Sequence, residues 1–151
     1  MAKEFVYVPV QTVQPGQDVL LENNSTSSNC GCSNSQIFHE SGSGIITLSA
    51  PRCGNACNKF AEYSVIFNAN IAVPATETPG EISLTLTQNG EQILSSQSIA
   101  TPTAVDAYGN VTVAKLVRVP KVCGCIDIAI ENTSTIPVNV QNVNVTVVRE
   151  S

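Results

Sequence analysis

The sequence predicts an all-β fold in which two antiparallel sheets pack face to face. Three observations support this expectation. Apolar and polar residues alternate along most of the chain, which is the period of a strand with one buried face. Clusters of Gly, Pro, Asn and Ser separate the alternating segments at short intervals. No segment shows the 3.6-residue period of an amphipathic helix.

The composition agrees with a single β-rich domain. The 151 residues match the usual size of one domain, so we expect one domain over residues 1–151, with residues 1–4 as a short N-terminal tether. Hydrophobic residues make up 42% and charged residues only 13%, with no Trp, so Val, Ile and Leu must build the core. A net charge of −5 argues against nucleic-acid binding. No apolar run is long enough to span a membrane.

The first third of the chain is expected to form two short strands and a hairpin. Residues 5–13 alternate, and Pro9 removes a ladder donor, so this strand is expected at a sheet edge. A second strand follows at 18–22. Residues 36–40 and 45–48 flank the sequence SGSG, whose glycines supply the positive φ angles of a tight turn.

The middle third contains the longest expected strand. Residues 60–73 alternate with one wholly apolar face, which predicts a central strand. Residues 82–87 alternate Ile and Leu with Ser and Thr, which predicts a half-buried strand. Asn89-Gly90 then predicts a hairpin turn into a strand over residues 91–99.

The last third is expected to form three more strands. They cover residues 111–119, 126–131 and 138–147, and a slip in the alternation near Gln141-Asn142 predicts a β-bulge. The chain therefore has about ten short strands at regular spacing. This number and spacing predict a two-sheet antiparallel sandwich of the jelly-roll kind.

The cysteines are the most unusual feature of the sequence. Six of them form three close pairs in or beside expected loops: Cys30 and Cys32, Cys53 and Cys57, Cys123 and Cys125. Three interpretations remain open. The loops gather at one end of the sandwich and form disulfides, the thiolates bind zinc or another soft metal, or the thiols stay reduced in a cytoplasm. The candidate disulfide interpretation implies a final location outside the cytosol.

The remaining chemistry of the sequence does not indicate an enzyme. His39 is the only histidine, and the neighbouring Glu40 must face the other side of a strand, so we expect a strand-end histidine without a catalytic role. The acidic residues form no visible pair, and no phosphate-binding loop or metal motif occurs. We therefore expect no catalytic residues, no cofactor and no metal ligands outside the cysteines.

Five Asn-x-Ser/Thr sequences occur, at Asn23, Asn24, Asn110, Asn132 and Asn144. The N-terminal sequence lacks the apolar segment of a signal peptide, so we expect synthesis in a cytoplasm without secretion. These asparagines are then expected to occupy turns and strand exteriors rather than to carry glycans.

Two segments of the sequence resemble the C-terminal half of the C1q/TNF-like jelly roll. The first resembles its pattern xLxLxxNGxxI and the second its closing strands; the matching residues are Leu84, Leu86, Asn89, Gly90, Ile93, Ile128, Ile130, Asn132, Ser134, Val138, Val140 and Val147. More closely, the sequence as a whole, including the segment VPVQTVQPGQDVLLENN, resembles small proteins of this type encoded by phages and prophages of clostridial and other gut bacteria.

The resemblance implies a homotrimer in which one sheet of each protomer packs around a threefold axis. It also implies a non-enzymatic protein on a virion surface, a capsid decoration or fibre-head protein whose partner is the major capsid protein or another virion protein. An alternative is a glycan- or receptor-binding head of a tail fibre or surface appendage, acting through residues 23–35 or 101–109. A weaker alternative is a cysteine-based metal-binding protein. The sequence departs from the family in lacking a stalk and an acidic calcium-binding cluster, and its cysteine pairs are not part of the family pattern.

Overall fold

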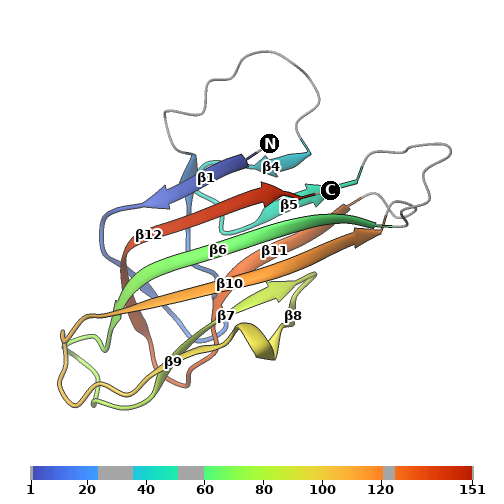
Figure 1. Cartoon of the computed structure of the whole chain (residues 1–151). Coiled ribbons are helices and arrows are strands. Elements are labelled where there is room, and N and C mark those ends of the chain that lie inside the picture. The colour runs from blue at the N-terminus through green and yellow to red at the C-terminus, as the bar shows by residue number, and fades with distance from the viewer. Residues whose placement is uncertain (1, 24–35, 51–59, 121–124, 151) are drawn as a thin grey trace, which may run out of the picture.

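The computed structural model describes residues 2–23, 36–50, 60–120 and 125–150. These residues form twelve strands and one short 3-10 helix, and the strands make two antiparallel sheets that pack face to face (Figure 1). The predicted all-β jelly-roll sandwich is confirmed.

The first sheet contains the longest strands. Its order is β10 (Gly109–Pro120), β6 (Phe60–Ala72), β12 (Val138–Arg149), β1 (Ala2–Tyr7) and β3 (Glu22–Asn23), and β2 (Gln11–Val13) also pairs with β12. Strand β6 is central, as predicted, because β10 covers one of its edges and β12 the other. Strand β10 lies at the edge of this sheet.

The second sheet is built around β7 and β11. Its order is β4 (Ile37–His39), β5 (Ile46–Ser49), β11 (Cys125–Asn132), β7 (Ile82–Gln88) and β8 (Glu91–Gln92), and β9 (Ser98–Ala100) also pairs with β7. Both predicted hairpin turns are confirmed. Gly42 between β4 and β5 has a φ of 84°, and Asn89 and Gly90 between β7 and β8 have φ angles of 50° and 82°.

The core fills the space between the two sheets. All the inward side chains of β6 are at most 3% exposed: Ala61, Tyr63, Val65, Phe67, Ala69 and Ile71. The second sheet meets them with aliphatic side chains that are at most 5% exposed: Ile37, Ile46, Leu48, Ile82, Leu84, Leu86, Ile126, Ile128 and Ile130. Because each large aliphatic side chain contributes roughly 1.5–3 kcal/mol when buried, this layer supplies most of the driving force for folding.

The predicted β-bulge in β12 is confirmed. Gln141 pairs with Asn70 and Asn144 pairs with Asn68, so β12 has one extra residue between these pairs, and Asn142 adopts a φ of 51°. The extra residue resets the alternation of the strand. Five valines on both sides of the bulge consequently point into the core: Val138, Val140, Val143, Val145 and Val147.

Two expectations about the N-terminal part were wrong. Residues 2–4 are not a tether, because they begin β1 and pair with residues 148, 147 and 146 of β12. The expected strand 5–13 is two strands, β1 and β2, separated by a bend at Pro9. A proline lacks the N–H that a continuous ladder requires, so pairing with β12 stops on one side of it and resumes on the other.

Two expectations about the β7 hairpin also need correction. The expected strand 91–99 is interrupted by a 3-10 helix, η1 (Leu94–Ser96), which separates β8 from β9. Strand β7 is buried on both faces, because Ser83, Thr85 and Thr87 are at most 3% exposed. The hydroxyl of Thr133 covers part of this outer face and lies 2.8 Å from the Ser83 hydroxyl and 2.9 Å from the Thr85 hydroxyl.

A strap of residues 14–21 joins the two sheets. It continues the second sheet beside β11, where the Val19 N–H donates to Ile130 O at 2.8 Å and the Asn132 N–H donates to Gln17 O at 2.9 Å. Val19 and Leu21 are at most 1% exposed and add to the core. The strap therefore seals one side of the sandwich.

Candidate functional site

The outer face of the first sheet carries a network of amides and hydroxyls. Asn110 on β10 donates through Nδ2 to Asn68 Oδ1 at 2.7 Å and to Asn70 Oδ1 at 3.1 Å on β6. The Thr112 hydroxyl donates to Asn110 Oδ1 at 3.1 Å. On β12 the Thr146 hydroxyl donates to Asn144 Oδ1 at 3.2 Å. These polar side chains satisfy one another along the sheet surface, so their orientations are fixed before any partner binds.

The same face continues into an apolar region. Ile66 and Leu116 point outward from neighbouring strands and are 43% and 48% exposed. Among the described residues of β6 and β10, the outward charged side chains are Glu62 and Arg118, and Arg118 Nε lies 2.9 Å from Glu62 Oε1. The β6–β10 part of this outer face therefore carries little uncompensated charge, which lowers the cost of removing it from water.

The edge beside β10 is also apolar. Leu94 in η1 is 71% exposed and Ile99 in β9 is 54% exposed. The Lys115 ammonium donates to the Ser95 hydroxyl at 2.5 Å, which ties η1 to β10. Because β10 is an edge strand of 12 residues, an apolar border beside it forms a surface suited to association.

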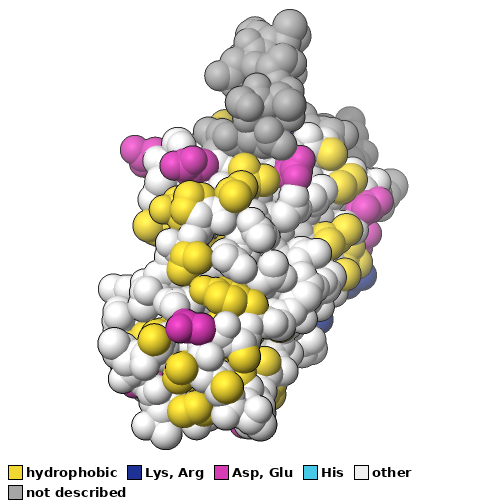
Figure 2. All heavy atoms as spheres, turned by 90° about the vertical axis from the view of Figure 1, so that its left-hand side faces the viewer, with side chains coloured by type: hydrophobic (Ala, Val, Ile, Leu, Met, Phe, Trp, Pro, Cys, Tyr) yellow, Lys and Arg dark blue, Asp and Glu magenta, His cyan; other side chains and the backbone are white. Residues whose placement is uncertain are grey.

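Further hydrophobic side chains are exposed where β1 ends and the chain turns toward β2. Figure 2 faces this side of the molecule and shows hydrophobic side chains among many uncharged ones. Val8, Val10 and Leu20 are 64%, 50% and 44% exposed. Gln11 holds this region in place, because its side-chain amide exchanges two hydrogen bonds with the backbone of Leu20, at 2.8 and 3.0 Å.

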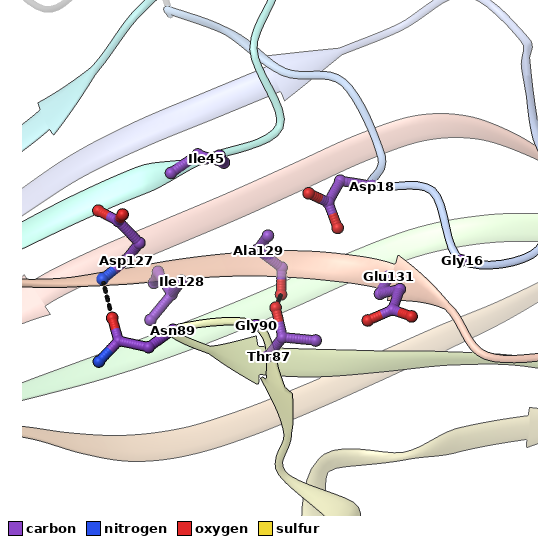
Figure 3. Close-up of a pocket in the computed structure, with 10 residues that line it drawn as sticks. All are labelled: Gly16, Asp18, Ile45, Thr87, Asn89, Gly90, Asp127, Ile128, Ala129 and Glu131. Atoms are coloured by element: carbon purple, nitrogen blue, oxygen red, sulfur yellow. Dashed lines mark hydrogen bonds between the residues drawn. The ribbon is translucent and has the colours of Figure 1, made fainter.

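The outer face of the second sheet differs, because it contains a pocket of about 550 Å³ (Figure 3). Its floor is formed by Ala129 and Thr87, which are opposite each other on β11 and β7. Asp127 and Glu131 flank Ala129 on the same face of β11 and rise on either side of it. The pocket exists because two small side chains lie between larger ones; its remaining walls are Gly16, Asp18, Ile45, Asn89, Gly90 and Ile128.

The pocket is acidic. Burial raises the pKa of Asp18, and burial followed by the charge of Asp18 raises the pKa of Glu131, while a hydrogen bond from Gln92 lowers it in part. Asp127 accepts a hydrogen bond from the Thr47 hydroxyl at 2.6 Å. The described residues that line the pocket include no Lys, Arg or His.

Most of the candidate disulfide cysteines lie outside the described residues. These are Cys30, Cys32, Cys53, Cys57 and Cys123; the sixth, Cys125, begins β11, is exposed and has no disulfide partner among the described residues. The described residue Cys125 pairs with Ser49, and the Ser49 N–H donates to Gln36 O at 2.8 Å. Gln36, Ala50 and Cys125 each border one of the three cysteine-containing segments, and Cys125 and Ser49 are paired, so these flanking residues lie at one strand end of the second sheet.

A buried tyrosine supports this end of the second sheet from the core. Tyr63 is fully buried, and its hydroxyl donates to Ser49 O at 2.5 Å and lies 3.4 Å from Gln36 Oε1. Burial raises the pKa of Tyr63, and the nearby Arg149 partly opposes this. The neutral hydroxyl thus remains a donor that holds Gln36 and Ser49 together.

The contacts of His39 hold the end of β4 in place. It is the last residue of β4, its Nε2 donates to Ser43 O at 2.8 Å, and its ring lies 4.8 Å from the ring of Phe5. Among the described residues, no group of three or more His, Cys, Asp or Glu side chains could hold a metal ion. Within the described parts of the chain, no helix is long and apolar enough to cross a membrane.

The Asn-x-Ser/Thr sequences fall in different surroundings. Asn110 and Asn144 lie on the outer face of the first sheet. Asn132 is fully buried and donates to Val13 O at 2.9 Å and to Ile136 O at 3.0 Å, so its amide is a structural element. Asn24 lies outside the described residues.

Sequence reasoning missed both the pocket and the apolar edge. The pocket depends on Ala129 facing Thr87 across two strands that are distant in sequence, and no local pattern records that pairing. The apolar edge depends on η1, where the sequence predicted a continuous strand. The candidate binding loop was predicted over residues 101–109; residues 101–108 are a loop in which most side chains are exposed, and Gly109 begins β10.

No protein-family profile matches the sequence, and no curated protein matches it. Among solved structures, murine APRIL is similar, with a TM-score of 0.61 and 12% identity over 99% of this chain and all of that chain. The PRD1 vertex protein P5 matches with a TM-score of 0.42 and 14% identity over 99% of this chain and 96% of that one. A family 35 carbohydrate-binding module from Paenibacillus barcinonensis matches with a TM-score of 0.36 and 19% identity over 99% of each chain. The likeness to APRIL shows a TNF-type jelly-roll fold and nothing about function, and the two weaker likenesses carry no argument.

Proposed function

We propose that this chain is a non-enzymatic structural protein that assembles as a homotrimer and decorates a virion surface, as a capsid decoration or fibre-head protein. The trimer rests on the C1q/TNF-like resemblance together with the outer face of the first sheet. The virion location rests on the resemblance to phage-encoded proteins alone.

The observation that carries the proposal is the low charge of the β6–β10 part of the outer face of the first sheet. Its amides are already bonded to one another, and Arg118 is already paired with Glu62. A partner that covers this part therefore strips water from apolar side chains such as Ile66 and Leu116, while the hydrogen bonds of Asn110 stay in place.

The apolar edge supplies the second half of a repeating contact. The edge carrying Leu94 and Ile99 and the face carrying Ile66 and Leu116 are different surfaces of one chain. When the edge of one copy packs against the face of the next, the contact is head-to-tail, and a rotation of one third of a turn closes the ring. A closed ring also covers the long edge strand β10.

Two features of the proposal concern the cysteines and the particle. The residues that flank the three cysteine-containing segments, Gln36, Ala50 and Cys125, lie at one strand end of the second sheet, which supports disulfides between the segments after release into an oxidising environment. A threefold protein also matches the threefold positions of an icosahedral shell, where each contact with the shell repeats.

The second candidate function is a glycan- or receptor-binding head. The observation that favours it is the pocket of about 550 Å³ on the second sheet, which lies on the opposite side of the sandwich from the proposed trimer face. The pocket remains open to solvent in such a trimer. The described residues that line it include no aromatic side chain, so they offer a sugar ring no stacking surface.

The test is native mass spectrometry of the whole chain, purified in air and measured with and without reductant. We expect a species of three 15.9 kDa chains that survives reductant. Each disulfide should lower the measured mass by that of two hydrogen atoms relative to the reduced protein. Leu116→Asp places a charge in the proposed interface, and we expect it to yield single chains.

The matched control is Phe38→Asp. Phe38 is 51% exposed, comparable with Leu116 at 48%, but it lies on β4 of the second sheet. This variant should remain trimeric. A wild-type protein that is a single chain at every concentration contradicts the trimer, and a trimer with six free thiols contradicts the disulfides while leaving the trimer intact.

A further inference from the structure

The strap of residues 14–21 is held against β11 by a short ladder. The Gly16 N–H donates to Asn132 O at 2.8 Å, and the Val19 N–H donates to Ile130 O at 2.8 Å. On its other side the strap meets the β4–β5 turn, where the Leu21 N–H donates to Ser43 O at 3.1 Å. The strap is thus fixed on two sides by backbone hydrogen bonds.

Asp18 and Glu131 occupy the centre of this ladder. They are directly opposite each other in an antiparallel bridge, and the hydrogen bonds lie at the flanking residues 17, 19, 130 and 132. Such a non-hydrogen-bonded pair brings Cα atoms to about 4.5 Å and its side chains closer than the alternative pairing does. Two carboxyl groups therefore share one position on the outer face of the sheet.

The surroundings do not neutralise this pair. The pocket that contains both residues also contains the carboxylate of Asp127, and none of its described lining residues is basic. From β8 the pair is faced by Gln92, which hydrogen-bonds to Glu131, and β8 also carries the exposed Glu91. From β7 the facing residues are Thr85 and Thr87, which are uncharged.

Packing of the β4–β5 turn on the strap also keeps the pair together. A Cβ added to Gly44 would lie 2.7 Å from the Cβ of Asp18 and 2.8 Å from Val19 O, so the β4–β5 turn packs directly on the strap. Glycine is required at this position by contact, because its φ is not in the left-handed region. Asp18 is therefore held opposite Glu131 by packing as well as by hydrogen bonds.

We propose that the Asp18–Glu131 pair is an acid-strengthened clasp, which holds the strap against β11 more tightly when one of the two carboxyl groups is protonated than when both are charged. When both groups are charged, two like charges oppose each other across the bridge, and this repulsion weakens the hold of the strap on β11. A single bound proton removes the repulsion and supplies an O–H donor to the other carboxylate.

The direction of the pH dependence follows from the folded and unfolded states. The pKa values of Asp18 and Glu131 are raised in the folded protein, so the folded state binds protons that the unfolded state has already lost. The contribution of the pair to stability therefore falls as the pH rises from the ordinary carboxyl range through the raised pKa values. Above them both groups are charged and the penalty is complete.

The test is urea unfolding of the whole chain at pH 7 and pH 4, for the wild type, Glu131→Gln and Asp18→Asn. At pH 7 we expect either variant to increase the equilibrium constant for folding by roughly twofold to fivefold, because each removes the same repulsion. At pH 4 this gain should largely disappear. The double variant should gain no more than either single variant.

Asp127→Asn is the matched control, since Asp127 lines the same pocket but is not opposite Asp18. It should leave the pH dependence of the wild type in place. Hydrogen exchange of the Gly16 and Val19 amides, corrected for intrinsic rates, gives a local measurement that does not depend on the oligomeric state. Their protection should increase several-fold on acidification in the wild type and not in Glu131→Gln.

Three results would overturn the clasp. Glu131→Gln and Asp18→Asn could destabilise the protein equally at both pH values, which means that the carboxylates act only as hydrogen-bond acceptors. Their effects could add in the double variant, which means that the two groups do not interact. Asp127→Asn could abolish the pH dependence, which assigns it to the pocket as a whole.

Discussion

The outer faces of the two sheets satisfy their polar groups in different ways. On the first sheet, the exposed side chain of Asn110 donates hydrogen bonds to the side chains of both Asn68 and Asn70. On the second sheet, the hydroxyls of Ser83 and Thr85 are buried and bond to Thr133, which belongs to the turn after β11. One face therefore bonds within its own surface, and the other is covered by a neighbouring segment of the chain.

This difference assigns separate roles to the faces. A surface whose polar groups bond to one another can be covered by a second protein at little cost, so the first face suits assembly. The second face contributes to the stability of the protomer, because removing the turn that covers it would leave buried hydroxyls exposed or without a hydrogen-bond partner. Variants of the second face should therefore change unfolding, and variants of the first face should change association.

The largest expected effect comes from Asn132→Ala, which removes the support of the covering turn. Asn132 donates to Val13 O and Ile136 O, and its Oδ1 accepts the Ser134 N–H at 2.9 Å. The truncation leaves these three buried or half-buried backbone groups without their partner. We expect the free energy of unfolding to fall by about 2–4 kcal/mol, measured by urea denaturation.

Asn139→Ala is the matched control for this prediction. Asn139 is half-buried on β12, and its Oδ1 accepts one hydrogen bond from the Thr12 hydroxyl at 2.7 Å. Its loss should cost less than about 0.5 kcal/mol. Equal costs for the two variants would contradict the distinction between a covering turn and a self-bonded surface.

A smaller effect is expected from Thr85→Val, which keeps the shape of the side chain and removes its hydroxyl. Thr85 is 1% exposed, and its hydroxyl lies 2.9 Å from the Thr133 hydroxyl, which also bonds Ser83. Because Thr133 retains Ser83 as a partner, we expect a loss of about 1 kcal/mol in thermal or urea unfolding. A stabilised variant would show that the hydroxyl pair does not contribute to holding the turn.

The sequence predicted those elements whose signal is local. The alternation of residues 60–73 identified β6 and its buried face, Asn89-Gly90 identified a hairpin, and the slip at Gln141-Asn142 identified the bulge. Each of these features is set by neighbouring residues, through side-chain period or backbone conformation. The jelly-roll class followed from the number and spacing of such strands.

The sequence did not predict features that depend on distant partners. Ser83, Thr85 and Thr87 have the pattern of a solvent-exposed face, and they are buried only because Thr133 and the neighbouring strands cover them. Asp18 and Glu131 are 113 positions apart, and only the register of the strap on β11 makes them partners. The cysteine pairs remain a prediction, since five of the six residues lie outside the described structure.

The smallest effect on unfolding is expected from Asn110→Ala, on the first face. The variant removes the two hydrogen bonds to Asn68 and Asn70 and the one from Thr112, but water replaces them because Asn110 is exposed. We expect a change in unfolding free energy of less than about 0.5 kcal/mol. In an assembled protein the side-chain oxygens of Asn68 and Asn70 would lose their donor in a dry interface. Dissociation on dilution should therefore begin at a several-fold higher protein concentration.

Ser64→Ala, on the same face, is the control and should not shift the dissociation curve. If Asn110→Ala instead costs as much stability as Asn132→Ala, the amides of the first face support the protomer itself, and the assignment of this face to assembly fails.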